Sequence, residues 1–298
     1  MPHRLVLVDG HAYAYRAYHA IRGLTAPDGQ PTNAIFGFIQ MLRRLVKELR
    51  PSHLAVVWDG GLSAERVAAH PSYKAQRPPM PAALPAQLDA LSAYLQAARI
   101  AAFCQAGVEA DDYIALAARR AAAAGLPVVI ASSDKDFMQL VSPAIGLVNP
   151  GDKSLAIGSE AQVREKTGVG PEQIVDWLSL IGDTVDNIPG VRGVGPKTAT
   201  QWLQHFGSVQ ALYGRLGEVP SQRWRTLLQA AEPAVRRNRD LIRLRDDLPC
   251  PCRLDDFRVQ PADGGRLVEL FQRWGFLKLA AEAQTVAANA DGLLPGLT

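Results

Sequence analysis

The segment RLVLVD at residues 4–9 is a short apolar run that ends in an aspartate, and the design recurs as LAVVWD at 54–59 and VVIASSD at 128–134. Apolar runs without polar alternation suit strands that are buried on both faces of a parallel sheet. Helical patterns lie between these runs, at about 33–49, 82–99 and 110–124. The alternation of strands and helices predicts an α/β domain with a mostly parallel sheet.

Composition places the chain among soluble globular proteins. Of its 298 residues, 48% are hydrophobic and 20% are charged, which excludes disorder, collagen and coiled coil as the overall class. No apolar stretch approaches the roughly 18 residues of a membrane span, and residues 1–10 lack the layout of a secretory signal. Cys104, Cys250 and Cys252 supply neither a disulfide framework nor a zinc site. We therefore expect a cytoplasmic protein that does not bind membranes.

Beyond residue 160 the pattern turns helical. PEQIVDWLSLI at 171–181 fits a helix with proline in its first turn, and a loop at 182–195 leads to a second helix at 196–206. Further helical patterns fit 221–231, 233–243 and 264–274. The last residues are small and predict disorder. These patterns divide the chain into a core at 1–160, a helical region at 161–280 and a disordered tail at 281–298.

Acidic residues follow each apolar run. Asp9, Asp59 and Asp134 end or follow the three predicted strands, and the functional crevice of such sheets lies outside the carboxyl ends of the strands. Asp136 stands next to Asp134, and further acids form clusters elsewhere in the sequence, at Glu109, Asp111, Asp112, Asp183 and Asp186. Carboxylates in a first helical turn also serve as caps, which is an alternative reading of the acids at 109–112.

Carboxylates that converge on one crevice raise the pKa of one another, and a bound cation is the usual remedy. The oxygen-only ligand set selects Mg²⁺ or Mn²⁺ over Zn²⁺ or Cu²⁺. Nine acids exceed the needs of one Mg²⁺, so we expect two ions that clamp an in-line phosphoryl displacement. This predicts phosphodiester hydrolysis by metal-activated water.

Charge supports a polyanionic substrate. The chain has 32 Lys and Arg against 29 Asp and Glu, and without the nine clustered acids the remainder has 20 acids against 32 bases. An acidic pit in a basic surround fits nucleic acid, although an even scatter of charge is the alternative.

The glycine-rich segment GVRGVGPKTA at 190–199 is neither a P-loop nor a dinucleotide fingerprint, because a helix precedes it and Pro196 interrupts it. It fits a helix–hairpin–helix in which glycines let the backbone approach phosphate, with Lys197 adding charge. Such contacts predict sequence-independent DNA binding, whereas glycines needed only for the turn are the alternative.

The connection at 61–81 is long, basic and rich in proline, as is typical of a lid or binding loop. Its basic and aromatic side chains suit a nucleic-acid strand, although a solvated loop is the alternative. They are Arg66, His70, Tyr73, Lys74 and Arg77. Arg16, with Tyr13 and Tyr15, lies just past Asp9 and is a candidate for holding a phosphate.

The ordered motifs LVDGHAYAYRAYHA, VVWDG, YKAQR, GVEADDYIA, SSDKDFMQL and GDTVDNIPGVRGVGPKTA resemble the 5′-nuclease superfamily. This superfamily includes the 5′→3′ exonuclease domain of bacterial DNA polymerase I and the phage flap endonucleases. The resemblance implies a PIN-like α/β nuclease core, a helical arch at about 61–90 and a helix–three-turn–helix at about 171–206. No polymerase follows in the sequence, so the chain resembles a stand-alone form. Glu65 and His70 stand where the family has aromatic residues.

The resemblance also assigns roles. Ligands of a first metal or its water shell would be Asp9, Asp59, Glu109, Asp111, Asp112 and Asp134, and those of a second metal Asp136, Asp183 and Asp186. Catalysis would rest on Asp9, Asp59, Asp111, Asp112, Asp134 and Asp136, with Lys74 and Arg77. DNA would be bound by Arg16, Arg66, Tyr73, Lys74, Arg77, Gly190, Arg192, Gly193, Gly195, Lys197 and Thr198. The hairpin backbone at Val191 and Val194 would hold a monovalent cation such as K⁺.

Together these readings predict a Mg²⁺-dependent, structure-specific 5′-nuclease. It would act as a flap endonuclease and 5′→3′ exonuclease on DNA with flaps, nicks or 5′ ends, in replication or repair. We expect a monomer that works alongside a DNA polymerase and a ligase. The alternatives are a non-catalytic branched-DNA-binding protein and a PIN-type ribonuclease. A HAD-type phosphatase fits less well, because its D-x-D motif would need an acid at His11.

Overall fold

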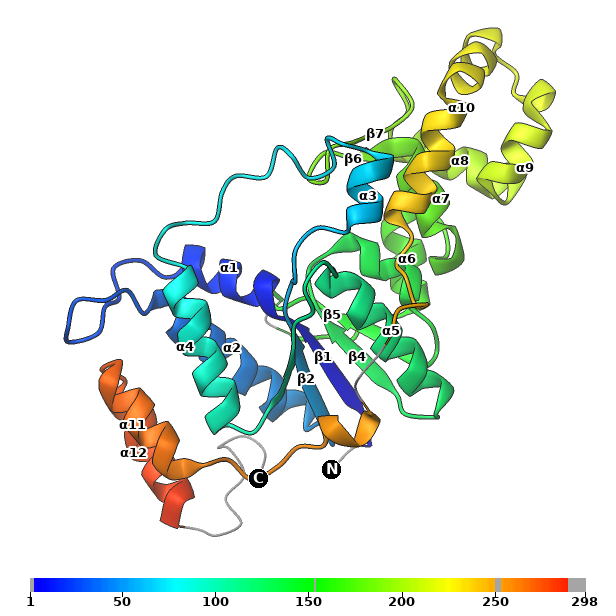
Figure 1. Ribbon diagram of the computed structural model, residues 1–298. Helices are drawn as coiled ribbons and strands as arrows, with labels where there is room; N and C mark the ends of the chain where they lie inside the picture. The colour runs from blue at the N-terminus through cyan, green and yellow to red at the C-terminus, as the bar shows by residue number, and fades with distance from the viewer. Residues whose placement is uncertain (1–2, 153, 250–252, 289–298) are drawn as a thin grey trace.

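The computed structural model describes residues 3–152, 154–249 and 253–288, and a five-stranded sheet lies at its centre (Figure 1). The strands are β1 (Leu5–Asp9), β2 (His53–Val57), β3 (Ala101–Phe103), β4 (Val128–Ala131) and β5 (Ile145–Val148). They are hydrogen-bonded in the order β3-β2-β1-β4-β5, and every pairing is parallel. The predicted α/β class is therefore confirmed.

Successive strand residues pack on opposite faces of the sheet. Val6 and Val8 of β1 face one apolar cluster, which includes α1 (Gly10–Ala20), α2 (Asn33–Leu49) and α4 (Pro85–Ala97). Leu5 and Leu7 face the other cluster, which includes α5 (Ala110–Ala123) and the 3₁₀ helix η1 (Lys135–Leu140). Helices on both faces bury the sheet, which explains why its strands lack polar alternation.

The predicted arch is helical over only part of its length. Between β2 and α4, the chain forms the short helix α3 (Ala64–Ala69) and then runs without a helix until α4 begins (Figure 1). Pro71, Pro78, Pro79 and Pro81 explain this difference, because proline lacks the backbone donor that a helix interior needs.

The helical region follows β5. It contains α6 (Glu160–Thr167), η2 (Pro171–Gln173), α7 (Ile174–Ile181), β6 (Gly182–Asp183), β7 (Ile188–Pro189), α8 (Pro196–Phe206), α9 (Val209–Gly214), η3 (Leu216–Glu218) and α10 (Gln222–Ile242). The two helices expected at 221–231 and 233–243 are one helix, with Pro233 in its interior. Burial of Leu228 and Val235, on either side of Pro233, offsets the helix-breaking tendency of proline.

The last part of the chain returns to the α/β core. After η4 (Leu254–Phe257), helices α11 (Gly264–Arg273) and α12 (Leu277–Ala288) bury Phe271 and Leu279 in the cluster that contains α2 and α4. The helical region therefore ends before the predicted residue 280. The prediction of disorder from residue 281 is wrong for 281–288, because α12 buries Ala283, and 289–298 lie outside the described residues.

Cys104 is exposed, and Cys250 and Cys252 lie outside the described residues. Among the described helices, we find none with both the length and the apolar character that crossing a bilayer requires.

Candidate active site

Two acids from neighbouring strands meet at the carboxyl edge of the sheet. Asp9 ends β1 and caps α1 by accepting a hydrogen bond from Ala12 N–H at 3.0 Å. Asp134 follows β4 and caps η1 by accepting from Asp136 N–H at 2.9 Å. Ser132 Oγ donates to the second oxygen of Asp9 at 2.9 Å. Sequence reasoning did not identify Ser132 as part of the site, although it lies in the same post-strand segment as Asp134.

Burial and mutual repulsion perturb these carboxyl groups. Burial raises the pKa of Asp9 to about 6, and the charges of Asp134 and Asp59 act in the same direction. Burial, followed by the charges of Asp134 and Asp9, raises the pKa of Asp111 well above its ordinary value. Asp59, whose carboxylate accepts from Ala110 N–H at 3.3 Å, also has a pKa raised by burial. Because each of these groups senses the charge of others, the structure brings Asp9, Asp59, Asp111 and Asp134 of the first set into one electrostatic neighbourhood.

A second group of acids could hold a cation directly. One carboxylate oxygen from each of Asp136, Asp183 and Asp186 lies within 4.8 Å of the others. Asp136 belongs to η1, whereas Asp183 and Asp186 belong to the β6–β7 hairpin. Burial, with repulsion from Asp134, raises the pKa of Asp136 well above its ordinary value. An all-oxygen set of this kind suits a hard divalent cation.

Glu109 and Asp112 are paired with basic residues of the arch segment that are themselves buried. Arg66 forms two hydrogen bonds of 2.7 Å with the carboxylate of Asp112, and Lys74 Nζ contacts Glu109. Burial acts to raise the pKa of Glu109, but Lys74 and Arg66 outweigh it and hold that pKa below its ordinary value. Tyr73 also donates to Glu109 from its hydroxyl, at 3.1 Å.

The arch residues predicted to bind DNA therefore differ in exposure. Arg66, Tyr73 and Lys74 are buried against the acids of the core. Arg77 pairs with Asp186 at 2.7 Å, yet 41% of its side chain stays exposed. Arg16 is exposed on α1, in the turns that follow Asp9. Of these residues, Arg16 and Arg77 are the ones that solvent reaches.

The glycine-rich segment forms the predicted turn between two helices, α7 and α8. Gly195 is the N-cap of α8 and Pro196 is its first residue. Arg192, Gly193 and Lys197 are exposed, while the side chains of Val191 and Val194 are buried. Val191 N–H donates to Leu180 O at 2.8 Å and Val194 N–H donates to Val191 O at 2.9 Å, so the monovalent-cation site stays a prediction about the remaining carbonyl capacity of this turn.

Close packing explains one glycine of this segment. A Cβ atom on Gly190 would lie 2.3 Å from the carbonyl carbon of Ile181 and 2.6 Å from Gly182 N. The hairpin backbone therefore crosses the end of α7 at a distance that only glycine allows.

Thr198 is the third residue of α8 and is partly exposed.

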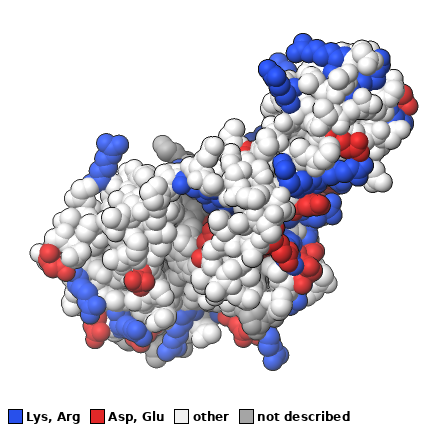
Figure 2. All heavy atoms as spheres, turned by 45° about the horizontal axis from the view of Figure 1, so that its top comes forward, with Lys and Arg blue, Asp and Glu red and all other residues white. Residues whose placement is uncertain are grey.

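The surface around the hairpin is basic. Residues 190–243 contain nine Lys and Arg against three Asp and Glu. Figure 2 shows Lys and Arg side chains gathered on the lobe that α8, α9 and α10 form. This charge bias is what a polyanion-binding surface requires.

The sequence did not reveal one further residue, which bonds to the chain on both sides of Asp183 and Asp186 of the β6–β7 hairpin. Asn238 of α10 is fully buried and donates from Nδ2 to Ser179 O at 3.1 Å and to Pro189 O at 2.7 Å. These two carbonyls flank the segment that carries Asp183 and Asp186. A lone asparagine within a helical pattern carries no sequence signal for this role.

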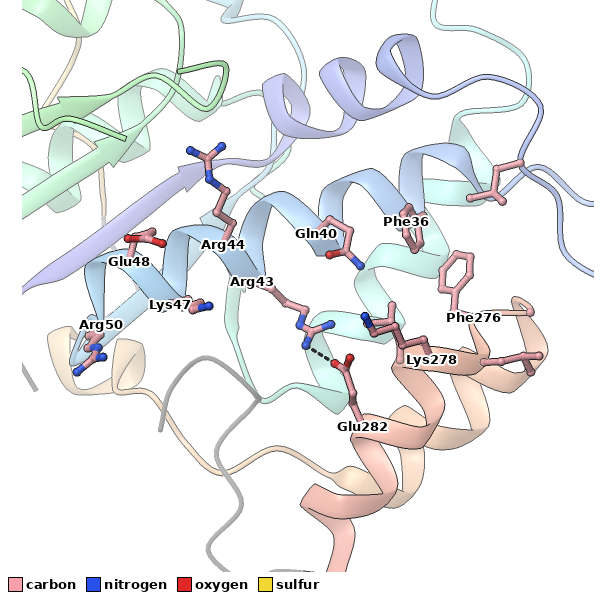
Figure 3. Close-up of a pocket in the computed structure, with 14 residues that line it drawn as sticks. Phe36, Gln40, Arg43, Arg44, Lys47, Glu48, Arg50, Phe276, Lys278 and Glu282 are labelled. Atoms are coloured by element: carbon pink, nitrogen blue, oxygen red, sulfur yellow. Dashed lines mark hydrogen bonds and ion pairs between the residues drawn. The ribbon is translucent and has the colours of Figure 1, made fainter. Parts of the chain in front are cut away.

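A large cavity lies elsewhere, between α2 and α12. Its volume is about 1000 Å³, and it is lined by Arg43, Lys47, Phe276 and Glu282, among others (Figure 3). Arg43 and Glu282 point toward each other across it and form an ion pair. None of the clustered acids lines this cavity, so we assign the chemistry to the acidic edge of the sheet rather than to this cavity.

The geometry of this edge agrees with the similarity to known proteins. Residues 4–168 match the family described as "5'-3' exonuclease, N-terminal resolvase-like domain", and residues 169–264 match "5'-3' exonuclease, C-terminal SAM fold". The chain is 34% identical over 287 residues to the 5'-3' exonuclease of Aquifex aeolicus, covering 96% of this chain and 97% of that protein. The chain therefore belongs to the 5'-3' exonuclease family.

Longer relatives are DNA polymerases. The chain is 37% identical over 303 residues to DNA polymerase I of Rhizobium leguminosarum, which covers 98% of this chain and 30% of the relative. It spans about a third of the length of such polymerase relatives.

Two solved structures share the fold. The T5 D15 protein, crystallised with metal ions, has a TM-score of 0.68 and 21% identity, covering 95% of this chain and 99% of that one. The catalytic core of Rad2 in complex with DNA has a TM-score of 0.63 and 16% identity, covering 95% and 92%. The α/β core with a helical C-terminal part is thus a fold shared with these proteins.

Proposed function

We propose that the protein is a Mg²⁺-dependent, structure-specific 5′-nuclease that removes 5′ flaps and digests 5′ ends of DNA. The observation that carries this proposal is the set of carboxylates at one edge of the sheet, buried at Asp9 and half-buried at Asp111 and Asp136, whose pKa values are raised. The family membership and the names of the relatives support DNA as the substrate.

The residues present fit two hard divalent cations. Asp136, Asp183 and Asp186 offer oxygens close enough to share one ion. The charge of Asp134 adds to burial in raising the pKa of Asp9 and of Asp111, and a second ion would relieve that repulsion. When bound, the two cations supply activation of water and neutralisation of charge at the scissile phosphate. Mn²⁺ shares this oxygen preference and is expected to substitute for Mg²⁺.

The protein's own groups would bind and orient the DNA. The hairpin at 190–197 would present its backbone and Lys197 to a duplex backbone, and the backbone at Val191 and Val194 would hold a K⁺ ion that neutralises phosphate charge. Arg77, which pairs with Asp186 and stays partly exposed, would contact a phosphate that enters the acidic crevice, while Lys74 would add its charge from a buried position beside Glu109 and Asp186. The single 5′ strand would pass along the exposed part of the arch segment, at 75–83.

The test is cleavage of an end-labelled 5′-flap duplex, beside matched linear duplex and single-strand substrates, in Mg²⁺ and then in EDTA. We expect Mg²⁺-dependent cutting near the flap junction. Asp134→Ala is expected to abolish cleavage while leaving DNA affinity nearly intact, because it removes one buried carboxylate and none of the hairpin. Tight binding without cutting in both Mg²⁺ and Mn²⁺ would support a binding protein instead, and cutting of RNA alone would support a ribonuclease.

The proposal includes a cellular setting. A monomer in the cytoplasm that hands its product to a DNA polymerase and a ligase would process flaps in replication or repair. Analytical ultracentrifugation tests the monomer, and ligation of the cleaved nick tests whether the product suits a ligase.

A further inference from the structure

The arch segment lies between β2 and α4, and the β6–β7 hairpin carries Asp183 and Asp186. Hydrogen bonds that involve backbone groups join the two. Lys74 N–H donates to Asp186 O at 3.0 Å, and Asn187 Nδ2 donates to Ser72 O at 2.7 Å. His70 Nε2 lies 2.9 Å from Asn187 O. More than 100 residues of sequence separate the two sides, so these contacts tie together parts of the chain that are otherwise independent.

Unusual backbone conformations accompany these contacts on both sides. Asn187 has φ = 57° and Lys74 has φ = 54°, which is the left-handed region. Asparagine adopts this region at a lower free-energy cost than most residues, and the cost for lysine is higher. A left-handed lysine whose N–H reaches Asp186 indicates that the contacts with the hairpin hold the arch segment in place.

The joined residues lie between the arch cations Lys74 and Arg77 and the carboxylates of the β6–β7 hairpin. Asp186 belongs to the carboxylate triad, and its side chain pairs with Arg77 at 2.7 Å and lies 3.8 Å from Lys74 Nζ. Beyond Lys74 the segment 75–80 is exposed and offers little packing of its own. Asn187 is therefore the hairpin side chain that bonds the arch backbone next to these cations, in addition to the ion pairs that the cations make themselves.

We propose that Asn187 is a positioning residue, which fastens the arch segment at Ser72 to the hairpin that carries Asp183 and Asp186. This inference rests on the proposed nuclease function, which it deepens by naming what aligns the arch cations with the second metal site. In this proposal Asn187 acts through Lys74, Arg77 and Asp186 rather than through the substrate.

The cleanest variant is Asn187→Gly. Glycine adopts positive φ freely, so this change removes the bond to Ser72 O without backbone strain. Asn187→Asp keeps the tolerance for positive φ but turns an acceptor toward the Ser72 carbonyl, so it is expected to be worse. Arg99→Gly is the matched control, because Arg99 is exposed, has φ = 51° and lies in the α4–β3 connection.

The first measurement is amide hydrogen exchange of the free protein, which needs neither metal nor DNA. We expect residues 70–77 to exchange roughly tenfold faster in Asn187→Gly, since one hydrogen bond of typical strength corresponds to about a factor of ten. The control should leave these residues unchanged. Unaltered exchange in Asn187→Gly would overturn the proposal whatever the enzyme does.

The second measurement is cleavage of the 5′-flap duplex across Mg²⁺ concentrations. We expect kcat to fall roughly tenfold with KM for DNA within about threefold, and the Mg²⁺ concentration for half-maximal rate to rise. Asn187→Asp should fall further, whereas Arg99→Gly should match the wild type. Wild-type kcat and Mg²⁺ dependence in Asn187→Gly would refute the positioning role, whereas inactivity of the wild-type protein would instead refute the proposed function.

Discussion

Asp9→Asn is predicted to stabilise the metal-free protein while abolishing its use of metal. The side chain of Asp9 is 7% exposed, caps α1 through Ala12 N–H and accepts from Ser132 Oγ. An asparagine carbonyl can keep the cap, and its amide can donate to the Ser132 hydroxyl instead. The substitution thus removes a buried charge with little change of shape.

The magnitude follows from the pKa of Asp9, which burial raises from 3.8 to about 6. A carboxyl group with a raised pKa in the folded state binds protons more readily when folded, so its contribution to stability falls as pH rises from about 4 to 6. Each pH unit in this interval corresponds to about 1.36 kcal/mol, so the ionised carboxylate destabilises the folded state by about 3 kcal/mol above pH 7. For a chain of this length, that is about 5 °C in Tm.

The assay is thermal unfolding of both proteins in EDTA at pH 8 and at pH 4. Asp9→Asn should unfold about 5 °C higher at pH 8, and the difference should be nearly gone at pH 4. Excess Mg²⁺ should stabilise the wild type selectively, because a ligand that binds only the folded state raises its stability. Asp89→Asn, at an exposed position of α4, should show no such pH dependence. Equal Tm values at pH 8 in EDTA, or the same gain at both pH values, would refute the reasoning.

Two further substitutions test the arch anchor and the hairpin. Arg66→Ala leaves Asp112 buried without its guanidinium partner. We expect urea titration to show that the free energy of unfolding falls by about 3–5 kcal/mol. A loss below about 1 kcal/mol would contradict a buried ion pair. Gly190→Ala forces the hairpin away from Ile181, and we expect roughly tenfold weaker duplex binding by fluorescence anisotropy in Ca²⁺. Gly214→Ala, where a Cβ meets no neighbour, is the matched control, and equal affinities of the two variants would show that the hairpin tolerates the change.

Much of the fold could be predicted because its central strands are buried on both faces. β1, β2 and β4 lie in the middle of the sheet, so their apolar runs are continuous in the sequence. β3 and β5 are the edge strands: β3 has only three residues, and β5 contains Gly146. Pairing with β2 and β4 stabilises these edges, and a local pattern does not record that pairing.

The acids of the site could also be predicted, because they follow strands or occupy short motifs. Their pairing could not, because it depends on the path of the arch segment. Arg66 and Asp112 are 46 residues apart, and nothing local in either motif indicates that they share two hydrogen bonds. The same limit explains why Tyr73, an aromatic residue in a basic loop, is buried against Glu109 rather than exposed for stacking.

This pairing separates the nine acids by what neutralises them. Glu109 and Asp112 have cationic partners from the arch segment, and Lys74 with Arg66 holds the pKa of Glu109 below its ordinary value. Across the described part of the chain, Asp9, Asp111, Asp134 and Asp136 form no ion pair with Lys or Arg, and burial raises the pKa of each. A divalent cation gains most where carboxylates lack another counter-charge. We therefore expect the metals to bind at the unpaired acids, with Asp183 and Asp186 joining Asp136 at the second site by exchanging the partly exposed Lys135 and Arg77 for the ion, while Glu109 and Asp112 keep their arch partners.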